Sequence, residues 1–211
     1  MPFLKNVLPT SAKRAGYLDS MIPSPLPEPI PLLQAASIDT VMAALVAVPK
    51  QLRQKPGLHV VMLRDRRRVL LLESGALRQA FPVAIGMPGW ETPTGRFKVL
   101  EKIDNPVWVH PVSGDRVADQ SSANPLGSHW IGFHRDCRGR DAHDGDQWIT
   151  IKGCTSTGFH GTPHRWTVGR AVSHGCVRLL NENVSTLYGQ VKLGTPVTVL
   201  PLDGTRSANP P

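Results

Sequence analysis

The sequence predicts a mostly-β domain with one short helix near each end. Short runs of β-branched and apolar residues recur between residues 59 and 200, and glycine or proline separates most of them. The 20 prolines and 19 glycines favour turns over long helices. With 211 residues, 40% of them hydrophobic, the chain can bury the core of one domain.

Residues 1–36 form the first zone and are expected to be an extended arm or linker. Proline stands at every second position from Pro23 to Pro31, which blocks helix and favours polyproline conformation. Residues 37–55 follow as one short helix and a connection. The helix is expected to run from Ser37 to Leu52, with Ser37 or Asp39 as its N-cap.

The strands are expected after this helix. Residues 59–63 and 69–72 are apolar runs on either side of the basic segment Arg64–Arg68, which predicts a β-hairpin. We interpret the basic segment as a solvated turn rather than as a contact for a polyanion. Further strands are expected at residues 81–85, 97–103, 130–133, 148–151 and 197–200, and a second helix at residues 183–191.

The charge and hydropathy of the chain limit its partners. A net charge of +8 favours an anionic partner such as nucleic acid, acidic lipid or an acidic polymer. Aromatic residues make up only 6% and no nucleic-acid-binding module is recognisable, so no nucleic acid is expected. The longest apolar run, residues 41–48, is shorter than the roughly 20 residues that span a bilayer, so no stable membrane insertion is expected. The first residues do not look like a secretory signal peptide, because no adequate apolar stretch follows their basic start.

The chain has three cysteines, Cys137, Cys154 and Cys176. An odd number leaves at least one thiol unpaired, which raises the possibility of a reactive cysteine. Cys137 and Cys154 could pair in an oxidising compartment. We favour the alternative, in which they are two separate reduced residues.

Residues 159–181 contain the groups with the clearest chemical potential. The imidazole of His160 could take the proton of the Cys176 thiol and make it nucleophilic, if the two lie on neighbouring strands or on a strand and the loop beside it. In an extended segment His174 points to the same face as Cys176, and the N–H groups of Gly175 and Cys176 are candidate donors to an oxyanion. The alternatives are a packed structural cysteine and a zinc site, although the spacing matches no common zinc pattern.

Several segments together resemble one known family. These are S-H-G-C-V-R-L at residues 173–179, H-G-T at 160–162, T-P-T-G-R-F at 92–97, N-P-L-G at 124–127 and the helix and strand at 187–197. Their order and spacing closely resemble the L,D-transpeptidase catalytic domain, also called the YkuD domain. Each segment is short, but the combination is highly specific and extends over roughly two thirds of the chain.

This resemblance implies a sandwich-like, mostly-β catalytic domain at residues 57–202, followed by a tail at residues 203–211. By position in the motif, Cys176 would be the nucleophile, and His160 would be the proton acceptor and donor. Gly161 falls where its backbone carbonyl would orient the base imidazole.

Other motif residues would line the site. His174 is one of them, and we count it with Cys176 and His160 among the catalytic residues. Arg178 would bind a substrate carboxylate through its fork of donors, or would make a structural ion pair, and the motif does not decide between these alternatives. Ser173 is expected beside the substrate, where it would fix the local turn by hydrogen bonding. Residues 136–145 look like a polar insertion that is either a lid over a cleft or a surface loop, and we favour the surface loop.

The implied reaction is acyl transfer on peptidoglycan stem peptides through a cysteine thioester. An acceptor amine would give a cross-link or exchange the terminal D-amino acid. The alternatives are an L,D-carboxypeptidase, in which water attacks the thioester, and a wall-binding module without catalysis. No metal or organic cofactor is needed, and carbapenem-type inhibitors are possible partners. The family resemblance places the protein in the cell envelope or periplasm.

Overall fold

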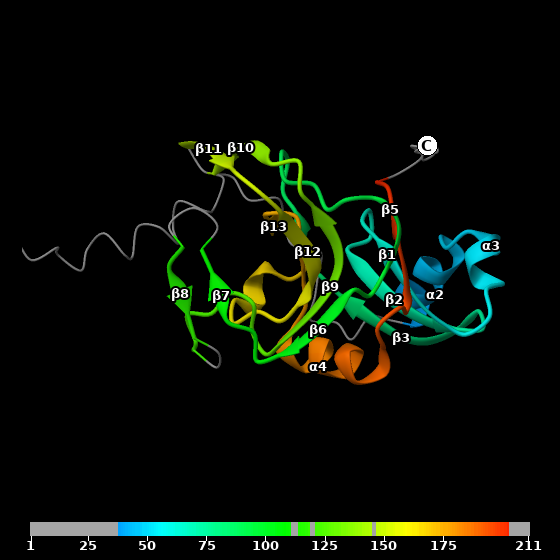
Figure 1. The fold of residues 1–211 in the computed structure, drawn as a ribbon. Coiled ribbons are helices and arrows are strands. Elements are labelled where there is room, and N and C mark those ends of the chain that lie inside the picture. The colour runs from blue at the N-terminus through cyan, green and yellow to red at the C-terminus, as the bar shows by residue number, and fades with distance from the viewer. Residues whose placement is uncertain (1–37, 111–113, 119–120, 145–146, 203–211) are drawn as a thin grey trace, which may run out of the picture.

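The computed structural model describes residues 38–110, 114–118, 121–144 and 147–202. Within these ranges, the strands form two main β-sheets that share one hydrophobic core (Figure 1). This mostly-β, two-layered architecture confirms the predicted fold class.

The first sheet has five strands in the order β3-β2-β1-β15-β5. β1 pairs in parallel with β15, and the other neighbours pair antiparallel. The strands are β1 (Leu58–Leu63), β2 (Arg68–Glu73), β3 (Ala76–Pro82), β5 (Gly95–Lys98) and β15 (Pro196–Leu200). Because side chains alternate along a strand, one face of this sheet joins the main core and the other is covered separately.

β1 and β2 form the predicted hairpin around a turn at residues 64–67. The solvated interpretation of this basic segment is wrong for two of its arginines, since Arg64 is only 8% exposed and Arg68 only 6%. Arg68 belongs to β2 and lies on the same face as the buried Leu70, so its aliphatic stem is covered together with the strand. Desolvation lowers the pKa of both guanidinium groups.

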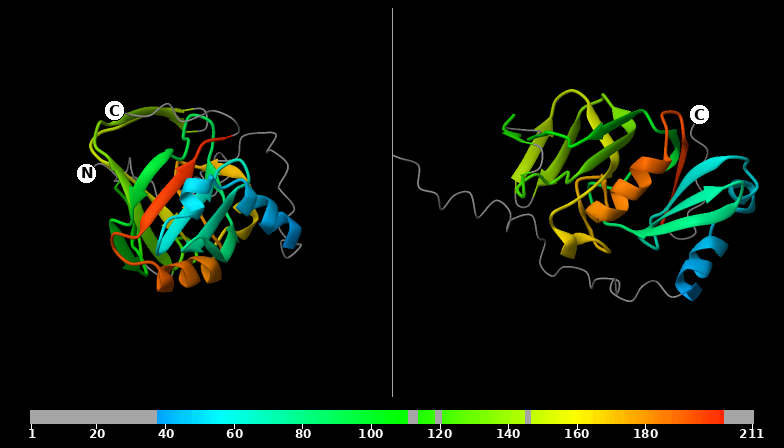
Figure 2. Two further views of the ribbon diagram at one scale, coloured as in Figure 1. Left: turned by 90° about the vertical axis from the view of Figure 1, so that its right-hand side faces the viewer. Right: turned by 90° about the horizontal axis from the view of Figure 1, so that it is seen from below.

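Two short helices, α2 (Ile38–Val46) and α3 (Lys50–Arg53), cover the outer face of the first sheet (Figure 2). The single helix expected from residue 37 to 52 is therefore wrong. Pro49 separates the two helices, because its ring removes a backbone donor and disfavours the helical conformation before it. The predicted arm at residues 1–36, the Ser37 cap and the tail at 203–211 lie outside the described residues. Among the described helices, none is long and apolar enough to cross a membrane.

The second sheet has four strands in the order β14-β12-β9-β6. These are β6 (Glu101–Asp104), β9 (His129–Asp136), β12 (Thr155–His160) and β14 (Val177–Arg178). The helix α4 (Asn181–Gln190) packs on the core face of this sheet through Val184 and Leu187 and corresponds to the second predicted helix. The fully buried Phe159 and Ile131 face the first sheet from β12 and β9, so the opposite face of β12 and β14 is available for a site.

The predicted strand at residues 97–103 is split between the two sheets. The N–H of Val99 donates to the carbonyl of Thr195 beside the first sheet, at 2.9 Å. The next N–H, that of Leu100, donates to the carbonyl of Gly132 in the second sheet, at 2.8 Å. One predicted strand thus crosses from sheet to sheet, which its residue pattern alone does not reveal.

The remaining elements are short and flank the second sheet. They are β4 (Ile85–Gly86) paired with β13 (Ala171–Ser173), β7 (Trp108–Val109) paired with β8 (Arg116–Val117), β10 (Arg140–Asp144) paired with β11 (Gln147–Ile151), and the 3-10 turn η1 (Arg165–Thr167). The β10–β11 hairpin and α4 lie at opposite ends of the second sheet (Figure 1).

Candidate functional site

Strand pairing brings the H-G-T motif and the S-H-G-C motif next to each other. β12 ends at His160 and pairs in parallel with β14, with Phe159 opposite Val177 and His160 opposite Arg178. Cys176 directly precedes β14, and its Sγ lies 3.8 Å from the carbonyl oxygen of Ser156 in β12. Cys176 and His160 therefore belong to adjacent strand ends, as the sequence predicts.

His160 is almost completely buried, with 3% of its surface exposed. Its ring stacks on Trp130 of the neighbouring strand, with 6.0 Å between ring centroids. Nδ1 lies 2.6 Å from the carbonyl oxygen of Gly161. Because a carbonyl only accepts, Nδ1 must carry the proton, and Nε2 is the basic nitrogen of the neutral ring. This is the orienting contact expected for Gly161.

The environment keeps the His160 imidazole neutral. Burial lowers its pKa from 6.5 to about 3, and the positive charge of Arg178 acts in the same direction, while the carbonyls of Gly161 and Leu126 oppose the shift. A neutral imidazole can accept a proton, which a general base requires.

The thiol of Cys176 is partly exposed and is protonated in the resting state. Burial of the sulfur raises its pKa, whereas a hydrogen bond from the Gly158 backbone and the charge of Arg178 favour the thiolate. Among the described residues, no hydrogen bond joins Cys176 to His160, since Sγ donates to Ser156 instead. The two residues therefore lie on neighbouring strand segments without a hydrogen bond between them.

A tight turn presents Cys176. The Ser173 hydroxyl donates to the carbonyl of Cys176 at 2.5 Å, and the Gly175 N–H donates to the Ser173 oxygen at 3.2 Å. Gly175 has a φ of 107°, a conformation that residues with a Cβ rarely adopt. Two expectations are corrected. The Gly175 N–H is occupied within the turn, which leaves the Cys176 N–H as the candidate oxyanion donor. The expected role of Ser173 in fixing the turn is confirmed, but this side chain is 1% exposed and too buried to touch a substrate.

Arg178 is partly buried, and none of the described side chains forms an ion pair with it. Its Nε is buried without a hydrogen-bond partner, and no ion pair to Arg178 is present in the described ranges. The structural ion pair considered as one alternative is therefore absent there. Its charge adds to the effect of burial in lowering the pKa of His160, and it partly opposes the rise that burial causes in the pKa of Cys176.

His174 lies beside Cys176 and is partly exposed. Its ring meets the edge of Trp90, with the two planes at 84° and the centroids 4.7 Å apart. The sequence did not single out Trp90, whose one signal is its position two residues before the T-P-T-G segment. In the part of the chain that the structure describes, no group of three or more His, Cys, Asp or Glu side chains is placed to hold a metal ion.

A cleft of about 500 Å³ adjoins the turn at Gly175. Its walls come from the loop after β4, the end of β9, the start of β12, and the segment that leads into β10. The charged side chains along it are Glu91, Asp136, Arg138 and Arg140. A substrate with both ammonium and carboxylate groups would find both signs of charge in the cleft next to Gly175.

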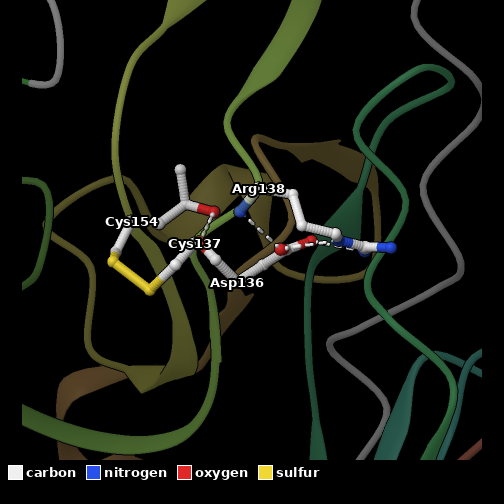
Figure 3. The surroundings of a disulfide bond; sticks show 5 residues. Asp136, Cys137, Arg138 and Cys154 are labelled. Atoms are coloured by element: carbon white, nitrogen blue, oxygen red, sulfur yellow. Dashed lines mark hydrogen bonds and ion pairs between the residues drawn. A yellow bond between two sulfur atoms is a disulfide. The ribbon is translucent and has the colours of Figure 1, made fainter.

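The β10–β11 hairpin borders this cleft and is held at its base by a disulfide between Cys137 and Cys154 (Figure 3). The favoured interpretation of two separate reduced cysteines is therefore wrong. The surface-loop interpretation of residues 136–145 is wrong as well, because residues 140–144 pair with β11 and Ala142 is buried. Sequence spacing could not show that β9 and β12 bring these cysteines to the same end of the sheet.

Comparison with known proteins relates this chain to one family. Residues 57–199 match the model of the YkuD family, the L,D-transpeptidase catalytic domain. YqjB of Bacillus subtilis (strain 168), named as an L,D-transpeptidase, is 29% identical over 67% of this chain and 70% of its own length. YcfS of Escherichia coli (strain K12), also so named, is 29% identical over 62% of this chain but only 39% of its own length.

The same fold occurs among solved structures. The Ldtfm–avibactam carbamoyl enzyme aligns with a TM-score of 0.50 and 17% identity, over 70% of this chain and half (50%) of that chain. The catalytic domain of the E. faecium L,D-transpeptidase aligns with a TM-score of 0.49 and 18% identity, over 69% of this chain and 98% of that domain.

Proposed function

Because this chain belongs to the L,D-transpeptidase catalytic domain family, we propose that it transfers acyl groups between peptidoglycan stem peptides through a thioester on Cys176. The observation that carries the proposal is the β12–β14 pairing, which brings Cys176, the one free cysteine among the described residues, to the strand segment next to a buried, neutral imidazole.

In the first half-reaction, Sγ of Cys176 turns from the Ser156 carbonyl toward His160 and gives its proton to Nε2. The thiolate attacks the carbonyl carbon between the third residue of the stem and its terminal D-amino acid. The Cys176 N–H donates to the oxyanion that forms. The C–N bond then breaks, the amine leaves with the proton from His160, and a thioester remains on the sulfur.

In the second half-reaction, an acceptor amine attacks the thioester carbonyl. His160 takes the proton of the amine, the C–S bond breaks, and the sulfur recovers its proton. A stem amine as acceptor forms a cross-link, a free D-amino acid gives exchange, and water gives hydrolysis. The cleft beside Gly175 supports a bulky acceptor, because it offers about 500 Å³ next to the nucleophile.

Arg178 is proposed to bind a carboxylate of the stem peptide. A buried guanidinium nitrogen without a partner is costly, and a bound carboxylate would satisfy it. The charge would also stabilise the thiolate during attack, which agrees with its effect on the Cys176 pKa.

The cell envelope is the proposed location. The Cys137–Cys154 disulfide supports it, because such bonds persist in oxidising compartments and are rare in the cytosol of most bacteria. The net charge of +8 fits a wall polymer that is rich in carboxylates.

The test is incubation of the purified protein with a tetrapeptide stem donor and an amine-bearing acceptor stem, followed by mass spectrometry. We expect a cross-linked product with the wild type and none with Cys176→Ala or His160→Gln. His59→Gln is the matched control, because it changes another buried histidine far along the chain, in β1. Cross-linking that persists in Cys176→Ala would refute the proposal, whereas hydrolysis alone by the wild type would assign the chain to the carboxypeptidase alternative.

A further inference from the structure

Trp90 lies between the β10–β11 hairpin and the turn that carries Cys176. It is 4% exposed. Its ring edge meets His174, with 4.7 Å between centroids, and its Nε1 donates to the carbonyl of His143 in β10 at 2.5 Å. One indole therefore contacts the hairpin and the residue two positions before the thiol.

The backbone around Trp90 is also attached to the turn. The N–H of Met87 donates to the carbonyl of Ser173 at 2.9 Å, and the N–H of Trp90 donates to the carbonyl of Met87 at 2.8 Å. A Cβ placed on Gly175 would lie 3.5 Å from the carbonyl oxygen of Trp90, which is ordinary van der Waals contact. The loop and the turn are thus packed together on both backbone and side chain.

Trp90 also packs against the β10–β11 hairpin. The guanidinium of Arg140 lies 4.6 Å from the indole centroid and donates to the carbonyl of Gly89. Ala142 and Ile151 of the hairpin pack with Trp90 in a small apolar cluster. The Cys137–Cys154 disulfide closes the base of the same hairpin, so its position relative to Trp90 is constrained covalently.

Trp90 can be replaced without removing a residue of the main core. Trp90 does not belong to the main core between the two sheets but to the separate cluster with the hairpin. Its removal should therefore leave the sandwich folded and loosen the contact between hairpin and turn. This separation makes a functional effect measurable without loss of the fold.

We infer that Trp90 is a positioning residue that couples the disulfide-closed hairpin to His174 and so holds the Cys176 thiol for attack. The inference rests on the proposed function of Cys176. The indole fixes the His174 ring from the side, while the hairpin fixes the indole. Loss of either contact lets the turn of residues 173–176 shift, and the nucleophile loses its alignment.

The experiment measures acylation by a carbapenem as a function of its concentration, followed by intact mass. This separates the maximal acylation rate from the apparent affinity. Trp90→Ala is expected to lower the maximal rate at least tenfold with little change in apparent affinity. Trp90→Phe keeps a ring against His174 but loses the donor to His143, so an intermediate rate is expected. The matched control is Trp148→Ala on the same hairpin, since Trp148 is 63% exposed, and it should acylate like the wild type.

The disulfide provides an independent arm. The double variant Cys137→Ser/Cys154→Ser should lower the same rate. When this double variant is combined with Trp90→Ala, the fold-reductions in the maximal acylation rate should not multiply, because both changes break the same connection between hairpin and turn. Melting of each variant shows whether the sandwich remains folded.

The inference is overturned if folded Trp90→Ala or Trp90→Phe acylates like the wild type, or if the losses multiply in the triple variant. Should Trp90→Ala fail to fold, Trp90→Phe and the disulfide variant decide alone, by the same criteria. Failure of the proposed function looks different, because acylation would then survive in Cys176→Ala.

Discussion

Acid conditions should leave acylation active well below the usual titration range of histidine. Burial and the charge of Arg178 lower the pKa of His160 from 6.5 to about 3, so the neutral base persists as the pH falls. At pH 5, a histidine of ordinary pKa would be neutral in only about 3% of molecules, whereas a pKa near 3 leaves about 99% neutral. The rate of acylation should therefore stay near its neutral value at pH 5.

The assay is the second-order rate of carbapenem acylation between pH 4 and 8, corrected for spontaneous hydrolysis of the drug. Circular dichroism at each pH identifies any loss of fold. Arg178→Gln should move the acid limb to higher pH, because the charge that disfavours the imidazolium is gone. A folded wild type whose rate falls with a midpoint at 6.5 or above would refute the assignment of a buried neutral base.

Three further changes test the surroundings of the site. The pKa of His59 is lowered from 6.5 to about 4, so the stabilisation from its neutral ring is fully present above pH 6.5. About 3 kcal/mol of the free energy of unfolding is lost as the pH falls toward 4. Urea unfolding of His59→Gln should lose this part of the pH dependence, and an unchanged dependence on pH would contradict the prediction. Gly161→Ala would place a Cβ 2.1 Å from Asn181 Oδ1. This clash should lower the free energy of unfolding by about 1–3 kcal/mol, and both the melting temperature and the acylation rate should fall. A variant with normal rate and stability would contradict this prediction, because the turn would then adapt freely. Lys102→Met removes the ammonium that donates to the carbonyl of Tyr188 at 2.7 Å. The free energy of unfolding, measured by chemical denaturation, should fall by about 2 kcal/mol while the acylation rate stays normal. A slowed acylation rate would contradict this and would show that α4 also shapes the site.

The elements set by local pattern could be predicted from the sequence. The β1–β2 hairpin, α4 and β15 each follow from apolar periodicity with turn residues on either side. The break at Pro49 also follows from the chemistry of proline, although one helix was expected to continue through it to Leu52.

The crossing at Val99 and Leu100 could not be predicted, because a strand-forming segment has the same local pattern whether it stays in one sheet or changes sheets. The pairing of Cys137 with Cys154 depends on the register of β9 and β12, which is a long-range property. The same holds for the contact of Trp90 with His174, which joins segments more than 80 residues apart.

At the site, the motifs indicated which residues gather but not which hydrogen bonds they make. The two motifs suggested neighbouring strands for His160 and Cys176, and the structure pairs β12 with β14, which Cys176 directly precedes. The capture of the Gly175 N–H by Ser173 was missed, because it depends on the φ of 107° at Gly175. The orientation of the Cys176 thiol toward Ser156 was likewise a matter of side-chain rotation.

The most direct test of the central claim is the site of covalent acylation. The purified protein is incubated with a carbapenem, and the adduct is counted by intact mass and located by peptide mapping. We expect one adduct per wild-type chain, on Cys176, none on folded Cys176→Ala, and retention of the Cys176 adduct in Cys137→Ser/Cys154→Ser. An adduct on Cys176→Ala, or a folded wild type that forms none, would contradict the assignment of Cys176 as the nucleophile.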